Sequence, residues 1–158
     1  MQEENEIKYK AIPTTYNGTR FRSILESKYA RLFDYYGLQW SYECLELKRY
    51  IPDFLITIND IDFLWEVKPA VQATEFKPAA RKLAQSGWRG PAIISGSRLE
   101  LTIVDDRPDL TLVGCLDVPN EGWSRVGRTR WPASWGTYPF EDIFSVWRGI
   151  SNQAQWNP

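Results

Sequence analysis

Two carboxylates and one ammonium group, those of Asp53, Glu66 and Lys68, lie at the ends of two neighbouring apolar segments. Between these segments, Asn59 and Asp60 are typical of a two-residue turn that joins antiparallel strands. In the register that such a turn sets, Asp53 lies directly opposite Glu66, and Lys68 follows on the same face because side chains alternate along a strand. The sequence therefore predicts a compact group of two acids and one base.

Two carboxylates in directly opposed positions repel each other, because their Cβ atoms lie only about 5 Å apart. A cation or a shared proton between them relieves the repulsion. Oxygen ligands favour a hard divalent ion, and Mg²⁺ sites use one or two carboxylates together with several waters. We therefore expect Mg²⁺ at Asp53 and Glu66, with the Lys68 ammonium placed to orient an attacking water or to offset charge on a phosphate. The alternative is that both acids face solvent and that Lys68 neutralises Glu66.

The same register divides the apolar side chains of the hairpin between its two faces. Leu55 and Leu64 lie beside the charged residues on one face. Pro52 and Pro69 limit ladder hydrogen bonds at the charged end, so we expect an open sheet end there. The residues that share the opposite, wholly apolar face are Phe54, Ile56, Ile58, Phe63, Trp65 and Val67.

The composition excludes several classes of site. The chain has 158 residues, of which 43% are hydrophobic and 25% charged, and this fits one globular domain. It contains no histidine, which excludes Ser-His-Asp hydrolysis, His-liganded zinc and His-dependent metal nucleases. Cys44 and Cys115 give neither a disulfide framework nor a thiolate zinc site, and they favour a reducing compartment. The charged first residues lack an apolar h-region and no apolar run could span a membrane, so we expect a cytoplasmic protein.

The hydrophobic pattern predicts an α/β fold with a mixed sheet. Apolar residues at helical spacing, a cap at Thr19 and a stop at Gly37 indicate a first helix, and small apolar residues before Gly87 indicate a second. Segments rich in β-branched and aromatic residues predict strands, of which the first three form an antiparallel meander. In chain order we expect a helix over 19–36, strands over 40–47, 50–58 and 62–68, a helix over 74–85, and strands over 91–95, 99–104 and 110–118.

Beyond Val118 the pattern changes. Tryptophans crowd a stretch that glycine and proline interrupt, which predicts loops followed by one short helix over 140–150. We place the core of a single domain at about 16–118 and treat 119–158 as a Trp- and Arg-rich extension. Arg125, Arg128 and Arg130 lie among these tryptophans, as in loops that enter a groove or stack on unpaired bases; core packing of the tryptophans is the alternative.

Basic residues gather after the predicted site, although the net charge of the whole chain is −1. From Lys68 to Arg98, only Glu75 opposes them. The alternative to a binding role is an ordinary solvated helix face. The basic residues that we expect to contact phosphates, on or just after the second predicted helix, are Lys77, Arg81, Lys82 and Arg89.

Pro52-Asp53, a spacer and Glu66-Val67-Lys68 resemble the motif of the PD-(D/E)XK nuclease superfamily. The resemblance covers about 16–96 and includes the order of elements, since the core of that superfamily is a helix, a three-stranded meander, a helix and a further strand. It implies a restriction-endonuclease-like core. Three stretches look like a group of small phage and bacterial proteins assigned as endonucleases: Phe21-Arg22-Ser23 with Leu25-Glu26, Trp40-Ser41-Tyr42-Glu43, and Tyr50-Ile51-Pro52-Asp53-Phe54.

The resemblance also implies roles for single residues. Asp53 and Glu66 match the metal ligands, which the Val67 carbonyl often joins, and Lys68 matches the catalytic lysine. Glu26 matches an acidic position on the first helix that contacts a metal-bound water. It falls at the border of the apolar stripe of that helix, which permits such a role.

Two further residues bear on the interpretation of the predicted site. Pairing with a neighbour such as Arg22 is the alternative role for the helix residue Glu26. Glu43, on the strand before the hairpin, is a weaker candidate for an outer position, and a plain surface residue is the alternative there.

The implied function is a Mg²⁺-dependent endonuclease, with Mn²⁺ as a substitute, that hydrolyses phosphodiester bonds of DNA above all and leaves 5′-phosphates. A different class of function stays open: a module on a nuclease fold that binds nucleic acid or protein without cutting, for example a phage factor acting on host defence. A homodimer or higher homo-oligomer with tryptophan-rich contacts is compatible with either.

Overall fold

The computed structural model describes residues 11–58, 60–69, 73–90, 92–97, 99–104, 107–112, 116–117, 129–130 and 143–156. Within these ranges the chain forms a mixed α/β fold, as the sequence predicts. Among these same residues, no helix has the length and apolar character that crossing a membrane requires. The predicted loops between Val118 and the last helix lie almost wholly outside the described residues.

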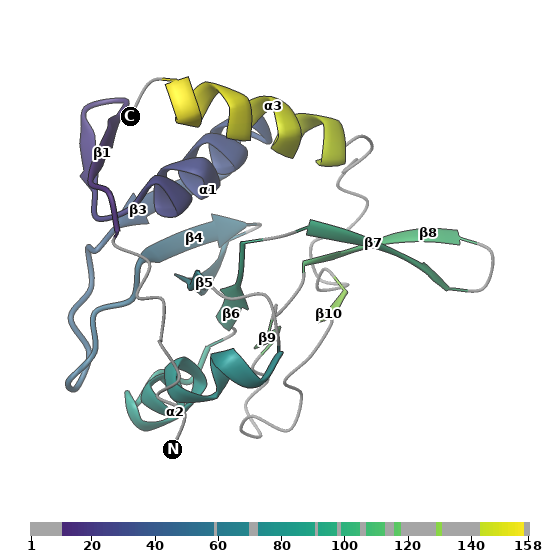
Figure 1. The fold of residues 1–158 in the computed structure, drawn as a ribbon. Coiled ribbons are helices and arrows are strands. Elements are labelled where there is room, and N and C mark those ends of the chain that lie inside the picture. The colour runs from purple at the N-terminus through teal and green to yellow at the C-terminus, as the bar shows by residue number, and fades with distance from the viewer. Residues whose placement is uncertain are drawn as a thin grey trace, which may run out of the picture.

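A mixed five-stranded sheet forms the middle of the molecule (Figure 1). The predicted meander is its first half, in which each strand pairs antiparallel with the next. The fourth strand joins parallel to the third, because a helical crossover separates them in the chain. In spatial order the strands are β3 (Gln39–Tyr42), β4 (Phe54–Ile58), β5 (Ile61–Val67), β6 (Ala92–Ser95) and β9 (Leu116–Asp117).

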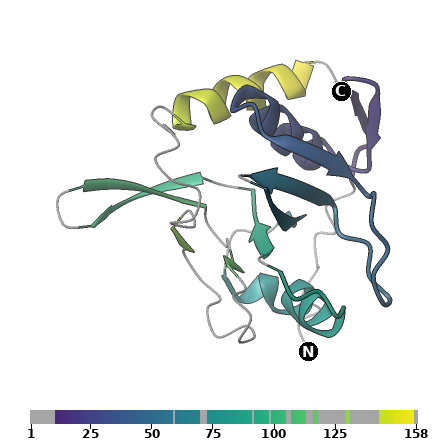
Figure 2. The ribbon, with the colours of Figure 1, turned by 180° about the vertical axis from the view of Figure 1, so that it is seen from behind.

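Two smaller antiparallel sheets accompany the central one. β1 (Thr14–Tyr16) and β2 (Thr19–Phe21) form a hairpin whose turn, Asn17-Gly18, has positive φ at both residues. β7 (Leu99–Val104), β8 (Arg107–Leu112) and β10 (Thr129–Arg130) form the other sheet, whose β7–β8 hairpin extends away from the central sheet in both views (Figures 1 and 2).

Helices cover both faces of the central sheet. α1 (Ile24–Tyr35) and α3 (Ile143–Trp156) lie side by side over one face, and α2 (Lys77–Gln85) lies under the other, after a 3₁₀ turn at Ala73–Phe76 (Figures 1 and 2). The molecule is therefore a three-layer arrangement with one core on each side of the sheet.

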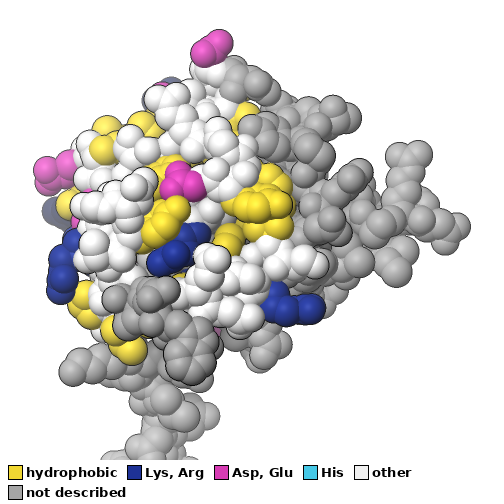
Figure 3. Space-filling model, turned by 90° about the horizontal axis from the view of Figure 1, so that it is seen from above, with side chains coloured by type: hydrophobic (Ala, Val, Ile, Leu, Met, Phe, Trp, Pro, Cys, Tyr) yellow, Lys and Arg dark blue, Asp and Glu magenta, His cyan; other side chains and the backbone are white. Residues whose placement is uncertain are grey.

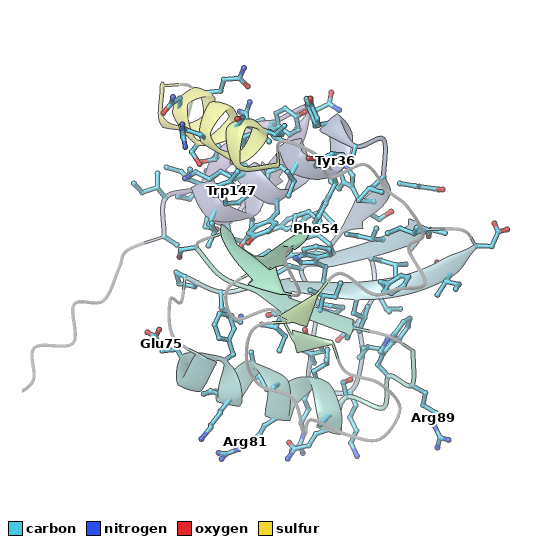
Figure 4. All side chains as sticks on the ribbon, turned by 90° about the vertical axis from the view of Figure 1, so that its right-hand side faces the viewer. Tyr36, Phe54, Glu75, Arg81, Arg89 and Trp147 are labelled. Carbon is cyan, nitrogen blue, oxygen red and sulfur yellow. The ribbon has the colours of Figure 1, made fainter. Side chains whose placement is uncertain are left out.

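The core between the sheet and α1 and α3 is aromatic. The ring of Phe33 on α1 lies 5.2 Å from that of Phe54 and 4.9 Å from that of Trp65, measured between ring centroids. Trp147 of α3 packs at 4.8 Å on Tyr29 (Figure 4). The six hairpin residues that the sequence assigns to one apolar face are all in this core, so the predicted division of faces is confirmed.

The first helix begins later than the sequence predicts. Thr19, the expected cap, lies in β2, because the Asn17-Gly18 turn folds that segment into a hairpin. Ser23 is the N-cap instead, and its hydroxyl accepts a hydrogen bond from the Glu26 backbone N–H at 3.2 Å. Gly37 ends the helix as expected, with φ of +66° and its N–H donating to the Asp34 carbonyl.

Several strand and helix bounds also differ from expectation. The segments predicted as strands over 40–47 and 50–58 are paired only over Gln39–Tyr42 and Phe54–Ile58, since the chain between them turns at Leu47–Tyr50. The described residues within 110–118 belong to two strands, β8 and β9, of different sheets. The last helix starts at Ile143 and continues to Trp156.

Replacing the observed cap tests the start of α1. We expect Ser23→Ala to lower the free energy of unfolding by about 1 kcal/mol, because the first helical turn loses the acceptor for one of its backbone N–H groups. Urea unfolding followed by circular dichroism measures this. Thr19→Ala is the control and should cost less than about 0.5 kcal/mol; a larger loss at Thr19 than at Ser23 would contradict the assigned cap.

Candidate active site

The β4–β5 hairpin has the register that the sequence predicts. Phe54 pairs with Trp65 and Ile58 with Ile61. Asp53 precedes the first of these pairs, and Glu66 follows Trp65, so the two acids meet at the end of the hairpin away from its turn. Lys68 comes directly after β5, where its backbone N–H donates to the Ser95 carbonyl of β6 at 2.9 Å.

Asp53 and Glu66 are held together by hydrogen bonds between side chain and backbone. The Val67 N–H donates to Oδ2 of Asp53 at 2.8 Å, and the Asp53 N–H donates to Oε2 of Glu66 at 3.2 Å. Each acid thus accepts a bond from the backbone of the opposite strand. The carboxylates replace ladder hydrogen bonds at this open end, so their positions are fixed by the chain itself.

Glu66 is buried, with 3% of its surface exposed. Its Oε1 accepts an ion-paired hydrogen bond from Lys68 Nζ at 2.7 Å, and its Oε2 accepts one from the Tyr50 hydroxyl at 2.6 Å. The sequence alternative, in which Lys68 neutralises Glu66, therefore describes a real contact. The same alternative also expected the Glu66 carboxylate to face solvent, and that part is wrong because Glu66 is buried. A buried carboxylate needs hydrogen-bond and ion-pair partners of the kind that Lys68 and Tyr50 provide.

The pKa values of this cluster follow from its burial and its excess of acids. Burial, followed by the nearby Glu66 carboxylate, raises the pKa of Asp53 to about 8. Burial lowers the pKa of Lys68, but Glu66, Asp53 and Glu26 together outweigh it, so the net change is upward. Burial and the adjacent Glu66 carboxylate raise the pKa of Tyr50, so its hydroxyl stays protonated and donates.

Glu26 reaches the same end of the sheet from the first turn of α1. It is 8% exposed, and its Oε2 accepts hydrogen bonds from the Arg22 backbone N–H at 3.0 Å and from the Tyr42 hydroxyl at 2.6 Å. The expected alternative, a pair with Arg22, is thus found in the backbone, whereas the Arg22 guanidinium pairs with Glu43 at 2.8 Å. Arg22 thus contacts both acids: its backbone N–H binds Glu26, and its guanidinium binds Glu43.

A pocket of about 300 Å³ opens beside this cluster. Its wall includes the start of α1 and the residues that follow β5, so Glu26 and Lys68 face a common space. The residues that line it are Ala11, Ile12, Ser23, Ile24, Leu25, Glu26, Val67, Lys68 and Pro69.

Sequence analysis missed two tyrosines of the site. Tyr42 and Tyr50 each donate to a candidate carboxylate, and burial together with that carboxylate raises the pKa of each hydroxyl. Tyr42 pairs with Phe54 across β3 and β4, so its place near the hairpin end follows once that register is set. No such signal exists for Tyr50, because it lies in an irregular segment between strands.

The expected nucleic-acid contacts that the structure describes lie mainly on α2 and directly after it. Lys77, Arg81 and Lys82 are exposed on α2, and Arg89 is exposed after it (Figure 4). In Figure 4 Arg81 and Arg89 extend away from the sheet. Arg125 and Arg128 lie outside the described residues, and of Arg130 only its place in β10 is described.

The donor set fits a hard divalent cation. Asp53, Glu66 and the Val67 carbonyl offer oxygen only, and in the described part of the chain no hydrogen bond reaches Oδ1 of Asp53. No group of three or more His, Cys, Asp or Glu residues able to hold a metal occurs among the described residues. A bound ion would therefore rely on two carboxylates, this backbone carbonyl and solvent.

Comparison with protein families, with curated proteins and with solved structures gave no match. The functional argument therefore depends on the geometry of this chain and on the motif in its sequence.

The raised pKa of Asp53 predicts how stability changes with pH. Between its unfolded value of about 4 and about 8, the folded state holds a proton that the unfolded state has lost, so stability falls as pH rises through this range. Asp53→Asn keeps an acceptor for the Val67 N–H and removes the charge. We expect it to stabilise the protein by more than about 1 kcal/mol at pH 8.5 in EDTA, and by clearly less at pH 5.

Urea unfolding at the two pH values measures this difference. Asp62→Asn is the matched control: Asp62 is exposed on β5, where it accepts a hydrogen bond from Thr57 at 2.7 Å, and it should show no gain at high pH. An equal effect of Asp53→Asn at both pH values would contradict the prediction.

Proposed function

We propose that this protein is a metal-dependent nuclease that hydrolyses phosphodiester bonds of nucleic acid, with DNA as the favoured substrate. The observation that carries the proposal is the hairpin register, which fixes the Asp53 and Glu66 carboxylates to each other's strands and sets Lys68 against Glu66. Acids that can hold a divalent ion, with an ammonium beside them, are suited to phosphoryl chemistry.

The order of elements supports a restriction-endonuclease-like core as part of this proposal. A helix, an antiparallel meander, a second helix and a strand parallel to the last meander strand follow one another from α1 to β6. This is also the order that the resemblance to PD-(D/E)XK nucleases implies. The candidate residues lie on α1 and β5, directly before β4 and directly after β5, so they gather near the carboxyl end of β5.

Each residue has a chemical role in the proposed reaction. When bound by Asp53, Glu66 and the Val67 carbonyl, Mg²⁺ would polarise the phosphate and make water a better nucleophile. The Lys68 ammonium, kept charged by its carboxylate neighbours, would orient that water or stabilise charge on the phosphate. Glu26, held by the Tyr42 hydroxyl, faces the pocket and can accept a proton or a hydrogen bond from water there.

A second candidate is a module that binds nucleic acid or protein without cutting. The contact that favours it is the ion pair between Lys68 Nζ and Glu66 Oε1, which satisfies both groups without any ion. In that case the acids would serve folding alone. The two candidates differ in whether a divalent ion binds and whether substrate is cut.

Thermal unfolding with and without a divalent ion tests the proposed metal site. Ten-millimolar Mg²⁺ or Ca²⁺ should raise the Tm of the wild-type protein by several degrees, since a ligand at 100 times its Kd adds about 2.7 kcal/mol. Asp53→Asn and Glu66→Gln should lose this shift, and Asp62→Asn should keep it. A shift that survives in the first two variants would show that the ion binds elsewhere.

Cleavage assays test the reaction itself. Supercoiled plasmid, single-stranded DNA and branched DNA should be cut in Mg²⁺ or Mn²⁺ but not in EDTA, leaving 5′-phosphate ends that a ligase accepts. Asp53→Asn, Glu66→Gln and Lys68→Met should each lower the rate at least about 100-fold, whereas Asp62→Asn should not. Nucleic-acid binding without cleavage in every sample would favour the second candidate.

A further inference from the structure

A second concavity, of about 530 Å³, is lined by Lys48, Arg49, Lys82 and Gln85. It lies between the segment that joins β3 to β4 and the last turns of α2. All four side chains are exposed, and three of them are cationic. Among the described residues that line it, three are cationic and none is acidic.

Lys48 and Arg49 form the tip of a tight turn. The Leu47 N–H donates to the Tyr50 carbonyl at 2.8 Å, and the Tyr50 N–H donates back to the Leu47 carbonyl at 3.2 Å. Arg49 has φ of +55°, a conformation that suits Gly or Asn and is costly for a long side chain. Backbone geometry favours Gly at this position, so turn geometry does not by itself explain the Arg49 cation.

Tyr50 links this turn to the acidic cluster. Its ring is buried beside Leu64 of β5 and Leu83 of α2, and its hydroxyl donates to Glu66. The backbone of Tyr50 follows Arg49 directly. The backbone of Tyr50 therefore adjoins the basic concavity, and its hydroxyl reaches the Glu66 carboxylate on the α2 side of the sheet.

We propose that the concavity of Lys48, Arg49 and Lys82 binds the sugar–phosphate backbone of a nucleic-acid strand next to the phosphate held at Asp53 and Glu66. The inference deepens the proposed function and rests on it. A polymer with one negative charge per nucleotide matches a row of cations, with Lys as a point charge and Arg as a two-pronged donor. On the face seen in Figure 3, over α1 and α3, Lys and Arg side chains lie apart from one another, with Asp and Glu side chains also present.

Binding measurements with a matched charge control test this inference. Fluorescence anisotropy measures binding of labelled single-stranded DNA, duplex DNA and RNA. Cutting is prevented in two separate experiments, by replacing Mg²⁺ with Ca²⁺ or by using the Asp53→Asn background. Lys48→Gln with Lys82→Gln should weaken binding at least tenfold near 0.1 M salt and lower the slope of log K against log salt by about one to two. The three polymers identify which backbone the concavity takes.

The control removes the same charge from the other side of the molecule. Arg20 of β2 and Arg148 of α3 are exposed, and α3 lies on the opposite face of the sheet from α2 (Figure 1). Arg20→Gln with Arg148→Gln should change affinity less than threefold and leave the salt slope unaltered. Equal losses in the two double variants would mean general attraction by net charge and would overturn the proposal.

Arg49→Gly separates binding from folding. Glycine adopts positive φ freely, so the Tm should stay the same or rise, while affinity should fall several-fold because one cation is gone. Arg49→Lys should restore most of the affinity. Unchanged affinity in Arg49→Gly would overturn the role of Arg49 while leaving metal-dependent cleavage intact, so a failure here is distinct from a failure of the proposed nuclease.

Discussion

The candidate site depends on two acidic side chains that are forced to meet across a strand pair. Asp53 and Glu66 would separate if the hairpin were free to do so, but the register is set by the opposite face, where Phe54 and Trp65 are fully buried against Phe33. A slip of one residue would turn every one of these side chains to the other face. The energy of an aromatic core thus holds an unfavourable electrostatic arrangement in place.

The structure compensates this repulsion with donors. The hydroxyls of Tyr42 and Tyr50 and the N–H groups of Arg22, Asp53 and Val67 all point at carboxylate oxygens. These bonds fix the geometry, but they do not balance charge, since among the described residues only Lys68 forms an ion pair with these acids, and the pKa of Asp53 remains raised. A divalent ion would lower the electrostatic energy of such a cluster, whereas it would do nothing for a neutral core. The unfavourable charge of the cluster therefore supports a functional interpretation.

The sequence could predict the parts of this arrangement in which hydrophobic residues recur at the regular spacing of a strand or a helix. Alternation along 54–58 and 61–67 gave the register and the faces, and helical spacing gave α1 and α2. The start of α1 was wrong because Asn17-Gly18 is a stronger local signal than the cap assigned to Thr19. Tyr50 and the Lys48–Arg49 turn could not be found, since the segment between β3 and β4 has no period and its position depends on packing against Leu83.

The location of the cluster in the sheet narrows what it can do. β5 and β6 are the parallel pair, and their carboxyl ends lie together, joined by the bond from the Lys68 N–H to the Ser95 carbonyl. In α/β sheets such ends are where ligands reach the strands without crossing a helix layer. Here Glu26 comes from the first turn of α1, in the helix layer on one face of the sheet. The turn at Tyr50 lies on the opposite face, where Tyr50 packs against Leu83 of α2. In the function that we propose, one extended chain of phosphates contacts both.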